Sequence, residues 1–225
     1  MGLRLLPLPG VFQPRSDSVM LARRIPEEPL RAGATVLDLC TGSGILAVTA
    51  ALAGASRVVA VDVARLAVLA ARLNARLNGV RVRAVRGDLF RPVAGECFDL
   101  IVSNPPYLPG PAGELPERGA ARAWEGGPHG RAFIDRICDQ ARSHLRPGGA
   151  LLLLQSSVCD VDETLARLTG QGLEAGIVFI HRGPLGPVLS NRVEWLREQG
   201  GLDENDHEEV VIIRAARPSE EGARR

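Results

Sequence analysis

Residues 35–52, TVLDLCTGSGILAVTAAL, join an apolar strand pattern, a glycine-rich turn and a helical pattern without a break. The first five residues form a nearly continuous apolar run, as in a strand of a parallel sheet that is buried on both faces. The turn CTGSG follows, and the helical pattern after it ends at Gly54. A buried strand, a glycine-rich turn and a helix in this order predict the start of an α/β fold.

Apolar runs and helical patterns alternate along most of the chain. Further strands are expected at residues 57–61, 80–85, 98–102, 150–154, 173–180 and 210–214. Further helices are expected at residues 17–24, 64–78, 131–145 and 160–168. Strands that alternate with helices form a parallel sheet covered on both faces. The last two strands have no helical pattern between them, which predicts a seven-stranded, mostly parallel sheet with an antiparallel strand near one edge.

Proline, glycine and charge set the remaining boundaries. Residues 1–30 are expected to be an extended lead-in with a short helix, residues 31–217 a single domain, and residues 218–225 a disordered charged tail. Residues 108–129 have little periodicity and are predicted to be a long loop. The polar segment 181–207 and the tryptophans Trp124 and Trp195 have no role that the sequence assigns.

The composition is that of an ordinary globular protein, and it excludes several functions. The chain has 225 residues, of which 45% are hydrophobic and 24% charged. Its net charge of +1, from 27 basic and 26 acidic residues, argues against binding nucleic acid or an anionic membrane through bulk charge. All the basic residues are arginine, which excludes Schiff-base catalysis and a phosphate-binding lysine.

The cysteines Cys40, Cys97, Cys138 and Cys159 lie far apart, with no C-x-x-C pair and no histidine at metal-ligand spacing. This spacing predicts neither a disulfide scaffold nor a metal site. The chain has no apolar run long enough to span a membrane, and its first residues lack the pattern of a signal peptide. A cytoplasmic protein with reduced thiols and no membrane partner is therefore expected.

Acidic residues follow three of the predicted strands and suggest a ligand site at one edge of the sheet. Asp62 ends the strand after the glycine-rich turn, where a carboxylate accepts hydrogen bonds from ribose hydroxyls, or caps the next helix. Asp88 is placed to accept from an adenine amino group, with Leu89 packing on the ring, although a plain turn is equally consistent. Asp38 precedes the turn, and a carboxylate there suits a cationic group better than a pyrophosphate, which it would repel. The NAD fingerprint G-x-G-x-x-G is not met, whereas a cofactor such as S-adenosylmethionine fits.

The most specific motif is Ser103-Asn104-Pro105-Pro106-Tyr107, directly after a predicted buried strand. Two prolines fix the backbone and remove two N–H donors, which leaves outward carbonyls without a local donor. Together with the side-chain oxygen of Asn104 these carbonyls form a rigid cluster of acceptors, suited to a planar –NH2 group. Tyr107, the only tyrosine in the chain, supplies a flat face beside them.

The segments LDLCTGSG, VDVA, GDLF and SNPPY, in this order and spacing, resemble the class I S-adenosylmethionine-dependent methyltransferases. They are most similar to the HemK/PrmC-type family, whose members methylate the side-chain amide of glutamine in the GGQ motif of translation release factors. The resemblance covers roughly residues 10–215. It includes QPRSDS at residues 13–18, similar to the family's stretch that closes over cofactor and substrate, and WEGGPHGR at residues 124–131.

The resemblance implies a Rossmann-like fold, S-adenosylmethionine as the cofactor and a protein substrate, most simply a release factor. Its implied catalytic residues are Asn104, Pro105, Pro106 and Tyr107. Its implied cofactor-binding residues are Ser18, Asp38, Cys40, Thr41, Gly42, Gly44, Asp62, Val63, Asp88, Leu89 and Asn104. Cys40 stands where the family has its first glycine. The resemblance does not include the helical N-terminal domain of bacterial members, which implies similarity to a short branch that works with a small activator subunit.

In this interpretation Asn104 Oδ1 and the Pro105 carbonyl accept hydrogen bonds from the two N–H groups of the substrate amide. These hydrogen bonds direct the amide nitrogen toward the methyl group. Exocyclic amines of nucleic acid bases are also planar –NH2 groups, so a nucleic acid acceptor stays open, although the chain lacks basic excess and has only 4% aromatic residues. Protein lysine or a small molecule are further alternatives. A non-catalytic scaffold that only binds the cofactor is the alternative of a different class.

Overall fold

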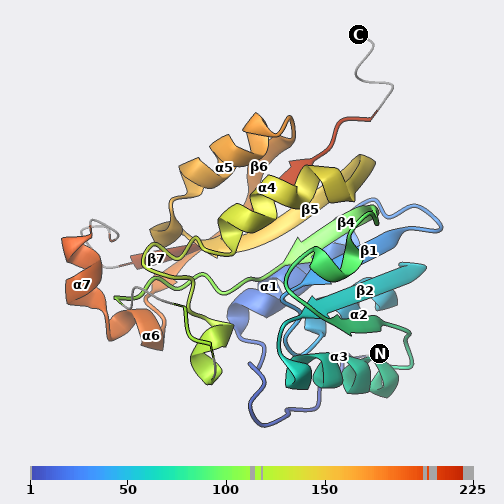
Figure 1. Cartoon of the computed structure of the whole chain (residues 1–225), viewed down its shortest axis with the longest axis horizontal. Helices are drawn as coiled ribbons and strands as arrows, with labels where there is room; N and C mark the ends of the chain where they lie inside the picture. The colour runs from blue at the N-terminus through green and yellow to red at the C-terminus, as the bar shows by residue number, and fades with distance from the viewer. Residues whose placement is uncertain (1, 112–114, 118, 200–201, 203–206, 220–225) are drawn as a thin grey trace.

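A computed structural model describes residues 2–111, 115–117, 119–199, 202 and 207–219 (Figure 1). Its seven strands form one sheet in the order β3-β2-β1-β4-β5-β7-β6. The strands are β1 (Thr35–Leu39), β2 (Arg57–Asp62), β3 (Arg83–Arg86), β4 (Phe98–Ser103), β5 (Leu145–Ser156), β6 (Glu174–Pro184) and β7 (His207–Ala216).

The direction of the strands confirms the predicted architecture. β1 pairs with β2 and β4, β2 pairs with β3, and β4 pairs with β5, all in parallel. β7 runs antiparallel between β5 and the edge strand β6. The order of the first strands changes direction at β1 and β4, and the carboxyl ends of these neighbouring strands are where open α/β sheets bind ligands.

Helices cover both faces of the sheet. They are α1 (Ser16–Arg24), α2 (Ile45–Leu52), α3 (Arg65–Leu77), α4 (Ile134–His144), α5 (Val161–Gly170), α6 (Pro187–Ser190) and α7 (Val193–Glu198). α2 contacts α1 and α3, whereas α4 contacts α5. Figure 1 shows α4 and α5 on one side of the sheet and α2 and α3 on the other.

The core forms because the central strands are apolar on both faces. Every residue of β1 is buried. Leu37, Ile101 and Leu151 are register neighbours across β1, β4 and β5, and none of the three is exposed. Burying one such side chain stabilises the fold by about 1.5–3 kcal/mol. The middle of the sheet is therefore a rigid support for the loops at its edge.

The structure differs from the sequence prediction between α4 and β5. The helix predicted at residues 131–145 begins only at Ile134, and β5 begins at Leu145 instead of after Pro147-Gly148-Gly149. The register of β4 against β5 shifts at this point, between Phe98 and Leu100. Proline and glycine mark such irregularities within a strand as well as its end, and the pattern alone does not separate the two.

The polar segment between the last two strands contains two short helices that the sequence pattern did not predict. β6 extends to Pro184, β7 begins at His207, and the short helices α6 and α7 lie between them. The predicted loop at residues 108–129 contains one bridge, from Leu108 to Glu125, and a short 3-10 helix at Ala120–Ala123. Residues 220–225 of the predicted tail lie outside the described residues. None of the described helices is long and apolar enough to cross a membrane.

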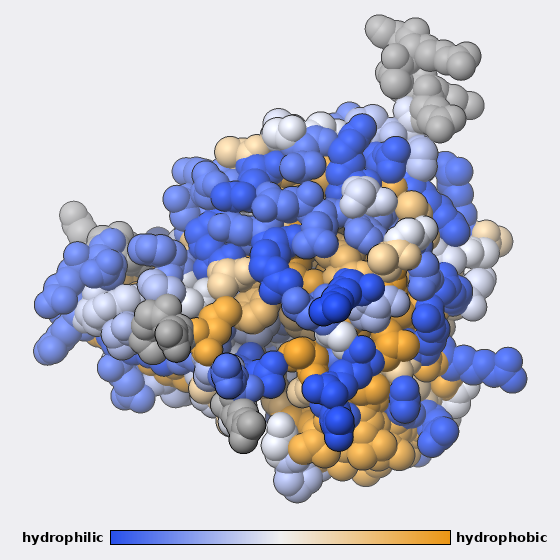
Figure 2. All heavy atoms as spheres, in the orientation of Figure 1, coloured by the Kyte–Doolittle hydropathy of each residue, from blue (hydrophilic) through white to orange (hydrophobic). Residues whose placement is uncertain are grey.

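The N-terminal lead-in lies along α3. The backbone N–H groups of Arg4 and Leu6 donate to the side-chain oxygens of Asn78 and Asn74. Figure 2 shows hydrophobic side chains gathered over this part of the molecule. Leu6 and Leu66 are each nearly half exposed there. The lead-in and α3 thus share an apolar surface patch.

Candidate active site

A cavity of about 1380 Å³ lies at the carboxyl ends of the parallel strands. Most of the predicted site residues line it: Ser18, Cys40, Thr41, Gly42, Asp62, Val63, Asp88, Leu89, Asn104, Pro105, Pro106 and Tyr107. Asp38 and Gly44 are not part of its wall. The structure therefore brings together segments that lie up to 89 residues apart in the sequence, from Ser18 to Tyr107.

Asp38 lies behind the glycine-rich turn and holds it in shape. Its Oδ2 accepts hydrogen bonds from Thr41 Oγ1 at 2.5 Å and from Ala47 N at 3.0 Å. Its Oδ1 is buried and has no partner among the described residues. A cationic group bound at the adjacent turn would stabilise the ionised form of this carboxyl group.

Cys40 and Gly44, two residues of the turn, have backbone conformations with positive φ. Cys40 has a φ of 58°, in the left-handed region, which explains why glycine suits this position. Holding a non-glycine residue there costs roughly 1–2 kcal/mol. Gly44 has a φ of 84°, and a Cβ on it would lie 2.7 Å from the Cα of Ala71 in α3. Gly44 is thus needed for close packing of α3 against the turn.

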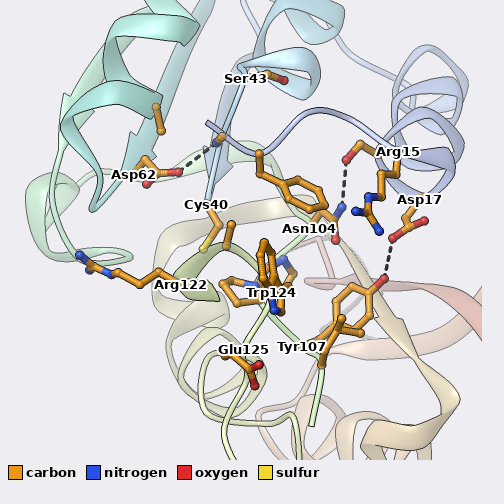
Figure 3. Close-up of a pocket in the computed structure, with 18 of the residues that line it drawn as sticks. Arg15, Asp17, Cys40, Ser43, Asp62, Asn104, Tyr107, Arg122, Trp124 and Glu125 are labelled. Atoms are coloured by element: carbon orange, nitrogen blue, oxygen red, sulfur yellow. Dashed lines mark hydrogen bonds between the residues drawn. The ribbon is translucent and has the colours of Figure 1, made fainter. Parts of the chain in front are cut away.

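Asp62, at the end of β2, points toward the glycine-rich turn and is hydrogen-bonded to it (Figure 3). Its Oδ2 accepts from Gly42 N and its Oδ1 from Ala64 N, both at 2.9 Å. Burial raises the pKa of Asp62, against the effect of these hydrogen bonds. Each carboxylate oxygen has a second lone pair, so both remain able to accept from a ligand hydroxyl.

The residues after β3 lie at the rim of the same cavity. Leu89 is buried and has a φ of 44°, which turns its side chain into the wall. Asp88 is about half exposed and forms an ion pair with Arg136 of α4. An apolar side chain beside an exposed carboxylate is the arrangement predicted for an adenine ring and its amino group.

The Asn-Pro-Pro-Tyr motif forms the opposite wall of the cavity. Asn104 Nδ2 donates to Ser18 Oγ at 3.0 Å. Among the described residues, none donates a hydrogen bond to Asn104 Oδ1 or to the carbonyl of Pro105. Figure 3 shows the Asn104 oxygen turned away from that hydrogen bond, toward Trp124 and Tyr107. The motif therefore presents two acceptors that the protein itself leaves unused.

Tyr107 closes the motif and is held at both ends. Its hydroxyl donates to Asp17 Oδ2 at 2.7 Å, and its backbone carbonyl accepts from Cys159 Sγ at 2.9 Å. Burial, followed by the nearby charge of Asp17, raises the pKa of Tyr107 well above its ordinary value. The tyrosine is thus a fixed, neutral and almost fully buried ring.

Several residues of the cavity wall were given no binding or catalytic role in the sequence analysis. Phe12 and Trp124 lie near each other, with ring centroids 6.5 Å apart. Asp17 and Glu208 also line the cavity, and Glu208 is only 8% exposed. Asp17 lies in the segment QPRSDS and Phe12 directly precedes it, so the resemblance of this segment to the family could have indicated both residues. Of the residues left without a role, Trp124 and His181 line the cavity, whereas Trp195 lines a separate hollow beside Arg131.

The residues present fit S-adenosylmethionine. Among the residues that line the cavity, Asp62 suits its ribose, and Leu89 with Asp88 suits its adenine. The described residues contain no group of three or more histidine, cysteine or acidic side chains placed to hold a metal ion.

Gly130, within WEGGPHGR, makes the closest approach to the motif. A Cβ on it would overlap the Tyr107 carbonyl oxygen and lie 2.6 Å from Cys159 Sγ. We expect Gly130→Ala to displace Tyr107 and to destabilise the fold by about 1–3 kcal/mol more than Gly127→Ala does. Gly127 is a matched control, because it also has positive φ but its Cβ would have no contact under 3.7 Å. Thermal unfolding of both variants measures the difference, and equal melting temperatures would contradict the expected overlap.

Asp38 makes the stability of the ligand-free protein depend on pH. Burial raises the pKa of Asp38 from 3.8 to about 7, so the folded protein keeps a proton that the unfolded chain has lost. Stability is therefore expected to fall as pH rises from about 4 to about 7 and to change little above that range. Asp38→Asn does not titrate and is expected to lack this component. The measurement is denaturant unfolding of both proteins across the range; a constant difference between them would refute the assignment.

Comparison with known proteins shows the family of the chain. The sequence model of the ribosomal protein L11 methyltransferase (PrmA) family matches residues 21–116. The relative named "Putative protein N5-glutamine methyltransferase MJ0928", from Methanocaldococcus jannaschii, is 34% identical over 176 residues, which are 78% of this chain and 87% of the relative. A release factor glutamine methyltransferase of Geobacter sulfurreducens is 37% identical over 161 residues, 68% of this chain. The chain spans about half of that relative, 55% of its length.

A solved structure has the same architecture. The Mtq2-Trm112 complex of E. cuniculi, responsible for the methylation of the eRF1 translation termination factor, is 25% identical and has a TM-score of 0.62. The match covers 92% of this chain and 99% of that chain. The extent of these likenesses, together with the motifs in the cavity, shows that the chain belongs to the HemK/release factor glutamine methyltransferase family of class I S-adenosylmethionine-dependent methyltransferases.

Proposed function

We propose that the chain methylates the side-chain amide nitrogen of a glutamine in a protein, with the GGQ motif of a translation release factor as the acceptor. The observation that carries this proposal is the pair of unused acceptors, Asn104 Oδ1 and the Pro105 carbonyl, on a wall of the cofactor cavity. An amide –NH2 group has two N–H donors in one plane. Two fixed acceptors match these two donors. A hydroxyl or a thiol has only one hydrogen to donate and would leave one of the two acceptors without a hydrogen bond.

S-adenosylmethionine, when bound, would supply the methyl group on its sulfonium sulfur for in-line displacement, with the thioether S-adenosylhomocysteine as the leaving group. The amide nitrogen is a poor nucleophile because its lone pair is delocalised into the carbonyl. Asn104 Oδ1 and the Pro105 carbonyl accept hydrogen bonds from the two N–H groups of the amide. These hydrogen bonds orient the amide nitrogen and stabilise the positive charge that develops on it. Pro105 and Pro106 fix the backbone, so the Pro105 carbonyl does not reorganise during the reaction.

The remaining wall supports an uncharged, planar acceptor. Tyr107 packs against the amide plane and is held neutral by its surroundings. No lysine exists in the chain, and the motif itself contains no histidine to act as a base. The amide proton is therefore lost after transfer, when the nitrogen is cationic and acidic.

The experiment that tests this proposal compares classes of acceptor. The protein is incubated with methyl-labelled S-adenosylmethionine and, separately, with a GGQ release factor, ribosomal proteins and total RNA from the same organism. We expect label in the release factor and loss of that label when its GGQ glutamine is changed to alanine. Label in RNA or in ribosomal proteins alone would refute the release factor as the acceptor and redirect the assignment.

We also propose a small partner subunit, by similarity to the E. cuniculi protein, which was solved as a complex with Trm112. The apolar patch at Leu6, Leu66 and Leu69 supports the proposal, since each of these side chains is nearly half exposed. Affinity purification of the tagged chain from its own organism tests it. A stoichiometric small protein is expected, and a chain that purifies alone with full activity on the release factor contradicts it.

A further inference from the structure

We infer that the first turn of α1 positions the catalytic motif, with Ser18 fixing the orientation of Asn104 and Asp17 that of Tyr107. The inference rests on the proposed role of the motif in holding the acceptor amide. Asp17 and Ser18 thus act through other side chains rather than on the substrate. Ser18, which the sequence assigned to cofactor binding, takes a different role here.

Ser18 anchors the side chain of Asn104 on the α1 side of the cavity. An asparagine amide has an oxygen that accepts and a nitrogen that donates, and a half-turn of the side chain exchanges them. The hydrogen bond from Asn104 Nδ2 to Ser18 Oγ, at 3.0 Å, holds the nitrogen on the α1 side. The oxygen is then left for the substrate. In the reverse orientation the Nδ2 group of Asn104 would face the N–H donors of the substrate amide, which would then not be held.

Asp17 acts in the same way on the neighbouring residue of the motif. The Tyr107 hydroxyl donates to Asp17 Oδ2 at 2.7 Å, and the ring is only 6% exposed. A hydrogen bond to an ionised acceptor is stronger than one between neutral groups. The ring plane is therefore fixed at its hydroxyl end by α1 and at its backbone end by Cys159.

α1 is firmly attached to the fold and can serve as this support. Leu21 is fully buried and Ala22 is 7% exposed in the core, and α1 packs on α2. Ser18 is itself only 6% exposed. Figure 3 shows Arg15 and Asp17 beside the motif, with dashed lines that mark the hydrogen bonds from Asn104 and Tyr107 to this turn. Two adjacent residues of one helix thereby fix two side chains of the motif, 86 and 90 residues further along the chain.

The first test is Ser18→Ala, with Ser18→Thr as the conservative variant and Val19→Ala as the matched control. Val19 lies next in the same helix, is 37% exposed and does not line the cavity. We expect Ser18→Ala to lower the single-turnover methylation rate of the release factor by about 3- to 10-fold, the effect of one lost hydrogen bond. The affinity for S-adenosylmethionine is expected to stay unchanged. Ser18→Thr restores the hydroxyl and is expected to restore the rate.

A second readout does not depend on the acceptor. The side-chain amide resonances of Asn104, followed by NMR on the isotope-labelled protein, are expected to shift in Ser18→Ala but not in Val19→Ala or Ser18→Thr. If they do not shift in Ser18→Ala, the inference is wrong whatever the activity. If the wild-type protein does not methylate the release factor but the resonances shift as expected, the proposed substrate fails and the positioning role stands.

A double-mutant comparison tests the Asp17 arm. Asp17→Ala is expected to slow transfer in the wild-type background and to have no further effect in Tyr107→Phe, which has no hydroxyl to hold. Equal losses in both backgrounds would show that Asp17 does not act through Tyr107.

Discussion

Replacing Asn104 with alanine is expected to slow methyl transfer by about 10²–10³-fold, the usual loss when one preorganised polar group is removed from a reacting centre. Asn104 Oδ1 is one of the two acceptors that the protein leaves free at the motif, and alanine removes it without touching the Pro105 carbonyl. The affinity for S-adenosylmethionine is expected to change little. Single-turnover kinetics and calorimetry measure the two quantities separately.

The control for this prediction is Asn191→Ala. Asn191 is exposed at the end of α6 and does not line the cavity. It is expected to keep the wild-type rate. Full turnover by Asn104→Ala would mean that the motif does not hold the acceptor, and the proposed mechanism would then be wrong.

Replacing Asp62 with alanine is expected to weaken cofactor binding by about 10²–10⁴-fold, because two charge-assisted hydrogen bonds to the ribose, of roughly 1.5–3 kcal/mol each, are lost. The structure adds a second cost. Asp62 also accepts hydrogen bonds from the backbone N–H groups of Gly42 and Ala64. The variant loses both, so the turn is less stable. The melting temperature of the variant is therefore expected to fall as well.

Calorimetric titration with S-adenosylmethionine tests this prediction, and Asp88→Ala is the matched comparison. Asp88 lies at the same edge of the sheet, is about half exposed and is already paired with Arg136. Its removal is expected to weaken binding much less. Unchanged binding by a folded Asp62→Ala protein would refute the ribose role.

The sequence predicted the parallel part of the sheet well because local signals and tertiary demands agree there. The strand at residues 35–39 is buried on both faces and was recognisable from its apolar run alone. The same holds for β4, whose end delivers Asn104 to the edge of the sheet. Parallel strands bring their carboxyl ends to one edge of the sheet, so the residues that follow these strands meet there.

Features that depend on distant contacts were not predictable from the pattern. β5 begins at Leu145 because an irregular pairing with β4 accommodates the residues around Pro147. The short helices α6 and α7 lack the periodicity of longer ones. Arg192, between them, is tied to the loop after the motif by hydrogen bonding to the Pro109 carbonyl and an ion pair with Glu125.

Some residues of the site were predictable from the sequence and others were not, for the same reasons. Asp62 and Asn104 were predictable because each ends a buried strand, so position along the chain specifies position in the cavity. Asp17, Trp124 and Glu208 reach the cavity from a helix, a loop and the start of β7. Asp38 shows the reverse: the sequence placed it at the ligand, whereas its carboxyl lies behind the turn and organises it. Only the folded arrangement separates a group that lines the cavity from one that supports the lining.

Fragment mass spectrometry of a release factor, incubated with S-adenosylmethionine and either the wild-type protein or Asn104→Ala, shows directly which atom receives the methyl group. We predict a mass gain of one CH2 on the glutamine of the GGQ peptide, located on the side-chain nitrogen, with the wild-type protein and almost none with the variant. A methyl group on another residue type, or equal modification by both proteins, would contradict the claim that this motif holds a glutamine amide for methylation.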